Sequence, residues 1–160
     1  MKYNYEPYWS ANFALQGKQP YIIDILKVMD TYKPKTILEL GSGKGFTSSE
    51  IKNYFPECSL TGIDIIAGNP YLDIYIKADL SEYDTDKKYD CILAQNVLLH
   101  IKPKHIKNVL DKIFKWSKNI VVFDYDPKDI IPLADFNFRH VFSMFPHKQR
   151  LSDDNSIFYT

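Results

Sequence analysis

Three closely spaced glycines follow a short apolar segment near residue 40. The segment Thr36–Leu40 reads T-I-L-E-L, and Gly41, Gly43 and Gly45 come directly after it. Glycine tolerates the positive φ angles of a tight turn and leaves the backbone open to a ligand. The residues after Gly45 predict the start of a helix, whose N-terminal N–H groups favour polar or anionic ligand groups. The segment therefore predicts a backbone cradle for a ligand, with the acidic Glu39 beside it.

Polar residues also end three later segments that are rich in strand-forming residues. Asp64 follows Ser59–Ile63, Asp79 comes shortly after Ile74–Lys77, and Gln95-Asn96 follows Asp90–Ala94. The carboxyl ends of parallel strands lie along one edge of a sheet, so these side chains are expected to meet the glycine turn there. Carboxylates accept hydrogen bonds from the hydroxyl and amino groups of a ligand. The alternative interpretation is that Asp64 and Asp79 only form turns at strand ends.

The elements that would hold these residues alternate between strand and helix along the chain. Helices are predicted over residues 20–32 and Phe46–Tyr54, from Pro103 onward and around Ile130–Phe136, and the remaining strands over Thr36–Leu40, Asn119–Phe123, Val141–Phe145 and Ser156–Tyr159. Such alternation predicts an α/β fold, a Rossmann-like doubly wound, mostly parallel seven-stranded sheet. The last two strands have no helix between them, which favours an antiparallel C-terminal hairpin.

The connection from Asp64 to the next predicted strand is too short for a full crossover helix. Gly68 and Pro70 lie within it, and both disfavour a helix, so we expect a loop or a single turn. We interpret Asn69-Pro70-Tyr71 in this connection as a turn.

Taken in order, the four segments resemble the class I S-adenosylmethionine-dependent methyltransferases. The matching residues are E-L-G-S-G-K-G at 39–45, T-G-I-D-I at 61–65, K-A-D-L at 77–80 and Y-D-C-I-L-A-Q-N-V-L-L-H-I at 89–101. The resemblance implies a small member that has little beyond the core fold. It also implies S-adenosyl-L-methionine as cofactor and S-adenosyl-L-homocysteine as product.

The resemblance also assigns roles to the polar residues. Glu39 would orient the amino end of the cofactor, Asp64 would accept the ribose hydroxyls, and Asp79 would accept from the adenine amino group. Ile65 and Leu80 would be apolar walls of the adenine, and Gln95 and Asn96 would flank the sulfur. The expected cofactor-binding set is Glu39, Gly41, Ser42, Gly43, Gly45, Asp64, Ile65, Asp79, Leu80, Gln95 and Asn96. Glu39 could instead be a hydrogen-bonded strand residue without a ligand.

Candidate catalytic residues follow the fourth and fifth predicted strands. His100 could act as a general base towards an acceptor that loses a proton, or it could be a helix-start histidine bonded to the backbone. Asp124 and Tyr125 end the fifth strand and are expected at the same crevice.

The amino-acid composition indicates which kinds of binding partner to expect. The 160 residues carry 20 basic and 20 acidic side chains, so the molecule has no overall attraction to nucleic acid or anionic membranes. Cys58 and Cys91 do not have metal-ligand spacing, and no metal is expected. We expect one cytoplasmic domain over 1–160 that acts on a small molecule, such as a sugar or another metabolite; it could form an oligomer. The aromatic N-terminal segment 1–19 would be a lid over the cofactor, or would pack on the helices.

Two other functions stay open at this point. One is a non-catalytic S-adenosylmethionine-binding protein that acts through a partner; a partner subunit would also be needed for methylation of a macromolecule. The other is a nicotinamide-dependent oxidoreductase. Its usual motif is G-x-G-x-x-G, whereas this chain has G-x-G-x-G and no second domain to hold a hydride acceptor.

Overall fold

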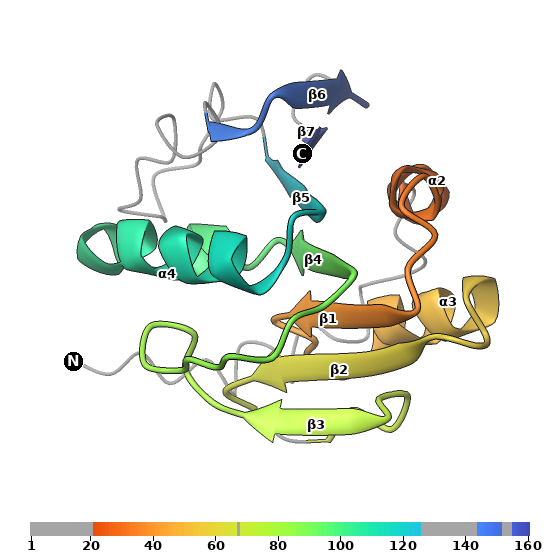
Figure 1. Ribbon diagram of the computed structural model, residues 1–160, viewed down its shortest axis with the longest axis horizontal. Helices are drawn as coiled ribbons and strands as arrows, with labels where there is room; N and C mark the ends of the chain where they lie inside the picture. The colour runs from red at the N-terminus through yellow and green to blue at the C-terminus, as the bar shows by residue number, and fades with distance from the viewer. Residues whose placement is uncertain (1–20, 67, 126–143, 152–154) are drawn as a thin grey trace.

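The computed structural model describes residues 21–66, 68–125, 144–151 and 155–160. Seven strands form one sheet in the order β3-β2-β1-β4-β5-β7-β6 (Figure 1). They are β1 (Thr36–Leu40), β2 (Ser59–Asp64), β3 (Ile74–Lys77), β4 (Cys91–Gln95), β5 (Ile120–Tyr125), β6 (His147–Arg150) and β7 (Asn155–Tyr159). Strands β1 to β5 pair in parallel, and β7 pairs antiparallel with both β5 and β6. The predicted α/β sheet with an antiparallel C-terminal hairpin is confirmed.

The central strands are apolar because both faces of the sheet are covered. In β1, Ile37, Leu38 and Leu40 are fully buried, and β4 buries Ile92 and Leu93 in the same way. The exception in β1 is Glu39, which is only 2% exposed. A carboxyl group in such a place costs free energy unless it is hydrogen-bonded or neutral, so its position points to a function.

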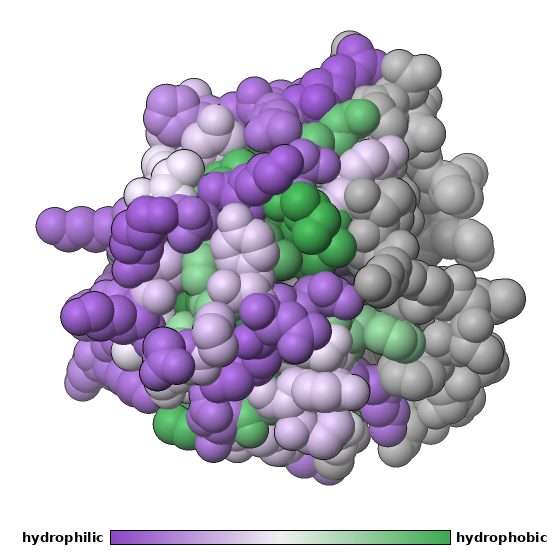
Figure 2. Space-filling view, turned by 90° about the vertical axis from the view of Figure 1, so that its right-hand side faces the viewer, coloured by the Kyte–Doolittle hydropathy of each residue, from purple (hydrophilic) through white to green (hydrophobic). Residues whose placement is uncertain are grey.

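Helices cover the two faces of the sheet (Figure 1). On one face, α4 (Pro103–Trp116) packs Val109, Leu110 and Ile113 into one core cluster. On the other face, α2 (Ile22–Asp30) and α3 (Phe46–Tyr54) pack into a second cluster. Figure 2 shows the second face, where hydrophilic side chains cover most of the described surface and apolar ones form small areas between them.

Two connections beside β3 contain turns in place of helices. Residues 65–73 join β2 to β3, and the described residues of this loop contain no helix, as expected from Gly68 and Pro70. Pro70 and Tyr71 form a turn, which confirms that part of the interpretation. Residues 78–90, between β3 and β4, also form turns. Because these connections contain no helix, the loops themselves border the edge of the sheet at which the parallel strands have their carboxyl ends.

The limits of most predicted elements agree with the structure to within two residues. The exception is the first closing strand, predicted at Val141–Phe145 and found at His147–Arg150. Met144 and Phe145 precede it, and Phe145 packs on Phe114 of α4 with ring centroids 5.7 Å apart. Phe145 therefore lies in the core beside α4, whereas Met144 is exposed. Strand β6 is an exposed polar edge strand with no apolar alternation to reveal it.

Some predictions fall on residues that the structure does not describe. They are the aromatic segment 1–19, the helix around Ile130–Phe136 and part of the misplaced strand, residues 141–143. Within the described ranges, no helix has both the length and the apolar character needed to cross a bilayer.

Candidate functional site

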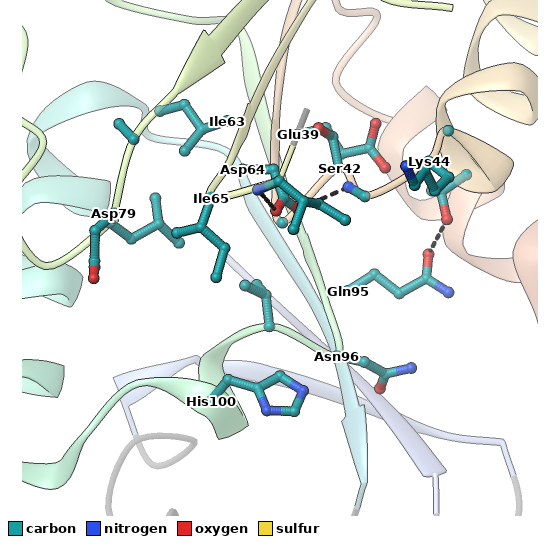
Figure 3. Close-up of a pocket in the computed structure, with 18 of the residues that line it drawn as sticks. Glu39, Ser42, Lys44, Ile63, Asp64, Ile65, Asp79, Gln95, Asn96 and His100 are labelled. Atoms are coloured by element: carbon teal, nitrogen blue, oxygen red, sulfur yellow. Dashed lines mark hydrogen bonds between the residues drawn. The ribbon is translucent and has the colours of Figure 1, made fainter. Parts of the chain in front are cut away.

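One pocket of about 230 Å³ opens where β1, β2 and β4 end. In Figure 3, Asp79 lies at one end of this pocket, and Glu39, Ser42 and Lys44 lie at the other. Its lining includes every predicted cofactor-binding residue: Glu39, Gly41, Ser42, Gly43, Gly45, Asp64, Ile65, Asp79, Leu80, Gln95 and Asn96, together with the predicted catalytic residue His100. Four segments that are far apart in sequence therefore meet at one site.

The glycine turn has the backbone that its composition predicted. Gly41, Gly43 and Gly45 have φ angles of 68°, 51° and 100°, which only glycine adopts readily. A Cβ at Gly43 would meet no atom within 4 Å, so this part of the turn borders open space. A Cβ at Gly41 would lie 2.6 Å from Val97, so this glycine is needed where the turn passes β4.

Asp64 links the glycine turn to the start of the next loop. Its Oδ2 accepts a hydrogen bond of 2.8 Å from the Gly43 N–H, and its Oδ1 accepts one of 2.9 Å from the Ile66 N–H. The carboxylate is half-buried and fixed at both oxygens. Each oxygen retains acceptor capacity for a ligand donor.

Glu39 borders the pocket from within the core. The Ser48 hydroxyl on α3 donates a hydrogen bond to its Oε2. The pKa of Glu39 is raised to about 8, mainly because the carboxyl group is buried; the Ser48 hydrogen bond lowers the pKa and the nearby Asp64 carboxylate raises it. At neutral pH the side chain is therefore mostly protonated, and an incoming cation would favour its ionised form.

The other end of the pocket is more exposed. Asp79 Oδ1 accepts hydrogen bonds of 2.8 Å from both the N–H and the hydroxyl of Ser81, so this residue does form the turn that the alternative interpretation proposed. It also lines the pocket. Leu80 is buried, and Ile65 is 46% exposed.

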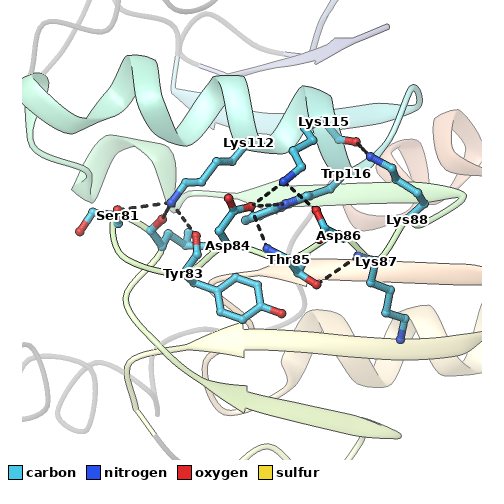
Figure 4. A network of polar contacts seen from close by, with 11 residues as sticks. Ser81, Tyr83, Asp84, Thr85, Asp86, Lys87, Lys88, Lys112, Lys115 and Trp116 are labelled. Atoms are coloured by element: carbon cyan, nitrogen blue, oxygen red, sulfur yellow. Dashed lines mark hydrogen bonds and ion pairs between the residues drawn. The ribbon is translucent and has the colours of Figure 1, made fainter.

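A buried lysine of α4 holds the loop after Asp79. Lys112 Nζ donates to the carbonyl oxygens of Leu80 at 2.7 Å and Tyr83 at 2.6 Å, with a longer contact to Ser81 (Figure 4). Burial lowers the pKa of Lys112. The partners are all backbone oxygens, so the amine ties this loop to α4.

Gln95, which ends β4, and the following Asn96 also line the pocket. Gln95 Oε1 accepts a hydrogen bond of 2.8 Å from the Thr47 hydroxyl. Asn96 has a φ of 49°, and its Oδ1 is buried without a hydrogen-bond partner in the described part of the chain. A positive φ in a residue other than glycine stores backbone strain, which is often found at functional sites.

His100 ends the short 3-10 helix η2 (Leu98–His100). Burial lowers its pKa, although the Asp64 carboxylate acts against this effect. The lowered pKa favours the neutral imidazole, which is the form that can accept a proton. Asp124 and Tyr125 end β5. Their side chains lie outside what the structure describes, so their position at the crevice stays a prediction.

Three hydrogen-bonding residues of the site were missed by the sequence interpretation: Thr47, Ser48 and Asn69. Asn69 was assigned only to a turn, yet its side chain is buried and bonded to the glycine segment. Thr47 and Ser48 lie in the first turn of α3. Small polar residues at a helix start are common for local capping, so their types alone could not identify them.

The residues present fit a ligand like S-adenosylmethionine. Open space at Gly43, a buried carboxyl group at one end and apolar walls at the other match the ligand's backbone contacts, its ammonium and its adenine. Ser42 and Asn96 line the pocket, and Ser42 Oγ and Asn96 Oδ1 are buried without a hydrogen-bond partner among the described residues. In the same residues, no three His, Cys, Asp or Glu side chains are grouped to hold a metal ion.

Comparison with solved structures shows the same fold in methyltransferases. An N1-methyltransferase from Burkholderia thailandensis, crystallised with 1,6-didemethyltoxoflavin and S-adenosylhomocysteine, has a TM-score of 0.76 at 12% identity, over 98% of this chain and 84% of the other. The N-methyltransferase NodS from Bradyrhizobium japonicum, with S-adenosylhomocysteine, has a TM-score of 0.62 at 14% identity, over 86% and 83%.

The plantazolicin methyltransferase BpumL, also with S-adenosylhomocysteine, has a TM-score of 0.65 at 19% identity. The match covers 79% of this chain but spans only 55% of the BpumL chain. At these identities the similarity shows the fold alone. No curated protein is similar enough in sequence to match the chain.

The family model described as a methyltransferase domain matches residues 14–151. This range includes all four motifs and nearly the whole sheet. The match and the shared fold together confirm the resemblance seen in the sequence. The chain belongs to the class I S-adenosylmethionine-dependent methyltransferases.

Proposed function

We propose that this protein transfers the methyl group of S-adenosylmethionine to an oxygen or nitrogen atom of a small molecule. The observation that carries the proposal is the meeting of Glu39, Asp64 and the glycine turn around one pocket. These groups supply acceptors for a ligand that is positively charged at its amino acid end and carries ribose hydroxyls in its middle. Two observations support a small acceptor: the net charge of the protein is zero, and the Burkholderia enzyme was crystallised with a small-molecule ligand.

In this proposal each end of the pocket binds one part of the cofactor. Asp64, already oriented by two backbone N–H groups, accepts the ribose hydroxyls. Glu39 lies nearest the α-ammonium and ionises when that group arrives. Ile65 and Leu80 enclose the adenine, while Asp79 accepts from its amino group. Gln95 and Asn96 border the sulfur. The segment 1–19 would close over the ligand and exclude water.

The bound cofactor supplies an electrophilic methyl carbon, so the acceptor's lone pair forms the new bond as the carbon–sulfur bond breaks and its electron pair stays on sulfur. The protein aligns the acceptor with that carbon. His100 accepts the proton that a hydroxyl or ammonium acceptor must lose, since its lowered pKa favours the neutral ring. Asp124 and Tyr125 would complete the acceptor side.

Calorimetry with S-adenosylmethionine and S-adenosylhomocysteine tests the binding part. We expect micromolar binding of both by the wild type, and a loss of at least ~100-fold in affinity for Asp64→Ala, which removes two hydrogen bonds to a charged group. Asp111→Ala, which changes an exposed aspartate of α4, is the matched control and should bind like the wild type. No binding by the wild type, or equal binding by Asp64→Ala, would contradict the proposal.

Methyl transfer from radiolabelled cofactor to a panel of hydroxyl and amine metabolites tests the catalytic part. His100→Gln should lower kcat by about 100-fold or more while the affinity for S-adenosylhomocysteine stays within about threefold of the wild type. Tight binding with no transfer to any acceptor would favour the alternative of a non-catalytic binding protein. An unchanged kcat in His100→Gln would remove the general-base role.

A further inference from the structure

The loop between β2 and β3 contributes a side chain to the interior of the site. Asn69 is 8% exposed, although it lies in a nine-residue loop between glycine and proline residues. Its Nδ2 donates a hydrogen bond of 3.1 Å to the Ser42 carbonyl and one of 2.7 Å to the Ser48 hydroxyl. Its Oδ1 accepts one of 3.1 Å from the Tyr71 N–H. The amide therefore uses both donor hydrogens and one acceptor site within the protein.

These contacts form a chain that ends at Glu39. The Ser48 hydroxyl has one proton, which it donates to Glu39 Oε2, while its oxygen accepts from Asn69. When Glu39 is ionised, and so can only accept, the two hydrogen bonds run in one direction: from the amide to the hydroxyl to the carboxylate. Each bond polarises the next, so the amide strengthens the hydrogen bond that opposes the burial of the Glu39 charge.

The same amide also holds the glycine turn. Ser42 is the residue between Gly41 and Gly43, and its carbonyl is one of the two acceptors for Asn69. A Cβ at Gly45 would collide with Asn69 Oδ1 and lie 2.7 Å from the Tyr71 ring, so the loop packs directly on the turn. The loop thereby takes the place that a crossover helix would fill beside the turn.

We propose that Asn69 is a positioning residue for the amino acid end of the cofactor, acting through Ser48 on Glu39 and through the Ser42 carbonyl on the glycine turn. The inference rests on the proposed function. It predicts an effect on ligands that carry the amino acid part and little effect on ligands that lack it. A general role in folding would weaken both kinds of ligand in proportion.

Binding of two ligands separates these possibilities. S-adenosylhomocysteine has the amino acid part, and 5′-methylthioadenosine keeps the adenosine and the sulfur without it. For Asn69→Ala, we expect about tenfold weaker binding of S-adenosylhomocysteine and a change within about threefold for 5′-methylthioadenosine. Retained binding of the shorter ligand also shows that the variant is folded. Asn53→Ala, at an exposed position of α3, is the matched control and should leave both affinities unchanged.

Ser48→Ala provides a second route to the same conclusion if Asn69→Ala does not fold. It should show the same selective loss, and the double variant should lose less than the product of the two single losses, because both variants break one chain of contacts. Equal losses for the two ligands, unchanged S-adenosylhomocysteine binding, or fully multiplicative losses would overturn the proposal. A wild type that binds neither ligand would instead contradict the proposed function.

Discussion

At the glycine-turn end of the pocket, buried polar groups bond to one another, whereas at the Asp79 end a single lysine amine reaches across from another element. Glu39, Ser48 and Asn69 are all less than 10% exposed and form a continuous chain of hydrogen bonds. Lys112 instead donates from α4 to backbone carbonyls of a loop that carries the exposed Asp79.

This difference indicates that substitutions at the two ends of the pocket should have different effects on ligand binding. A buried chain that contains a carboxyl group couples ligand charge, pH and turn geometry, so changes there should alter affinity and pH dependence. The Lys112 amine donates to backbone carbonyls, so it stabilises the conformation of the loop but offers a ligand no hydrogen-bond acceptor. Changes there should alter the order of the loop and the binding of adenosine more than the recognition of the amino acid part.

Gly45→Ala should have the largest effect, because it breaks the buried end at its tightest contact. The substitution places a Cβ at a φ of 100° and against Asn69 and Tyr71. We expect a loss of about 3 kcal/mol in the free energy of unfolding, measured by urea denaturation, and a loss of S-adenosylhomocysteine binding. Gly43→Ala is the comparison, with a φ of 51° and open space at the Cβ, and should cost only about 1 kcal/mol. Equal costs would show that the packing of Asn69 on the turn is unimportant.

Glu39→Gln should remove the pH dependence of stability that the buried end contributes. The pKa of Glu39 is about 8 in the folded protein, above the ordinary value of 4.5. The folded state therefore holds the proton more tightly, and the resulting stability is fully present below pH 4.5 and is lost progressively as the pH rises from 4.5 through 8. From pH 5 to pH 6.5, the wild type should lose about 2 kcal/mol relative to Glu39→Gln in urea unfolding. Parallel curves for the two proteins would contradict the raised pKa.

Ligand binding gives an independent measure of the same proton. If the ammonium of S-adenosylhomocysteine requires ionised Glu39, binding at pH 7 should release up to about one proton in the wild type. Calorimetry in buffers of different ionisation enthalpy measures this number. Release should be absent in Glu39→Gln, and it should be small for 5′-methylthioadenosine, which lacks the ammonium.

The fold could be predicted because its signals are local. Apolar runs such as Thr36–Leu40 and the amphipathic helix from Pro103 reveal their elements through periodicity, and glycines reveal the turn. Strand β6 gave no such signal, since an exposed edge strand reading H-K-Q-R has no buried face. The strand was instead predicted over the apolar segment that ends with Met144 and Phe145, just before β6.

The ligand edge of the sheet could likewise be predicted from motif order, but its supporting contacts could not. Asp64 and Glu39 are identified by their position at strand ends. Asn69 donates to Ser48 across 21 residues of sequence. Lys112 donates to the carbonyls of Leu80 and Tyr83 across 32 and 29 residues. These two donors are of residue types common in surface loops and helices. Burial, which only the folded chain shows, distinguishes them.

Lys112→Met tests the Asp79 end, where we expect a smaller effect. Methionine keeps most of the apolar stem but leaves the carbonyls of Leu80 and Tyr83 without their donor. Loss of that donor should cost about 1 to 2 kcal/mol in the free energy of unfolding by urea. Binding of 5′-methylthioadenosine and S-adenosylhomocysteine should weaken equally, because the loop contacts the part that both ligands share.

Lys115→Met is the control on the same helix. Lys115 forms ion pairs with Asp84 and Asp86 at the surface, as Figure 4 shows, and such pairs contribute little to stability. Its free energy of unfolding should be unchanged within error, and both ligands should bind as they do to the wild type. If Lys112→Met weakened only S-adenosylhomocysteine, as expected for Asn69→Ala, the two ends would be coupled and the distinction between them would be wrong. If Lys112→Met matched Lys115→Met in every measurement, the loop would keep its shape without the amine.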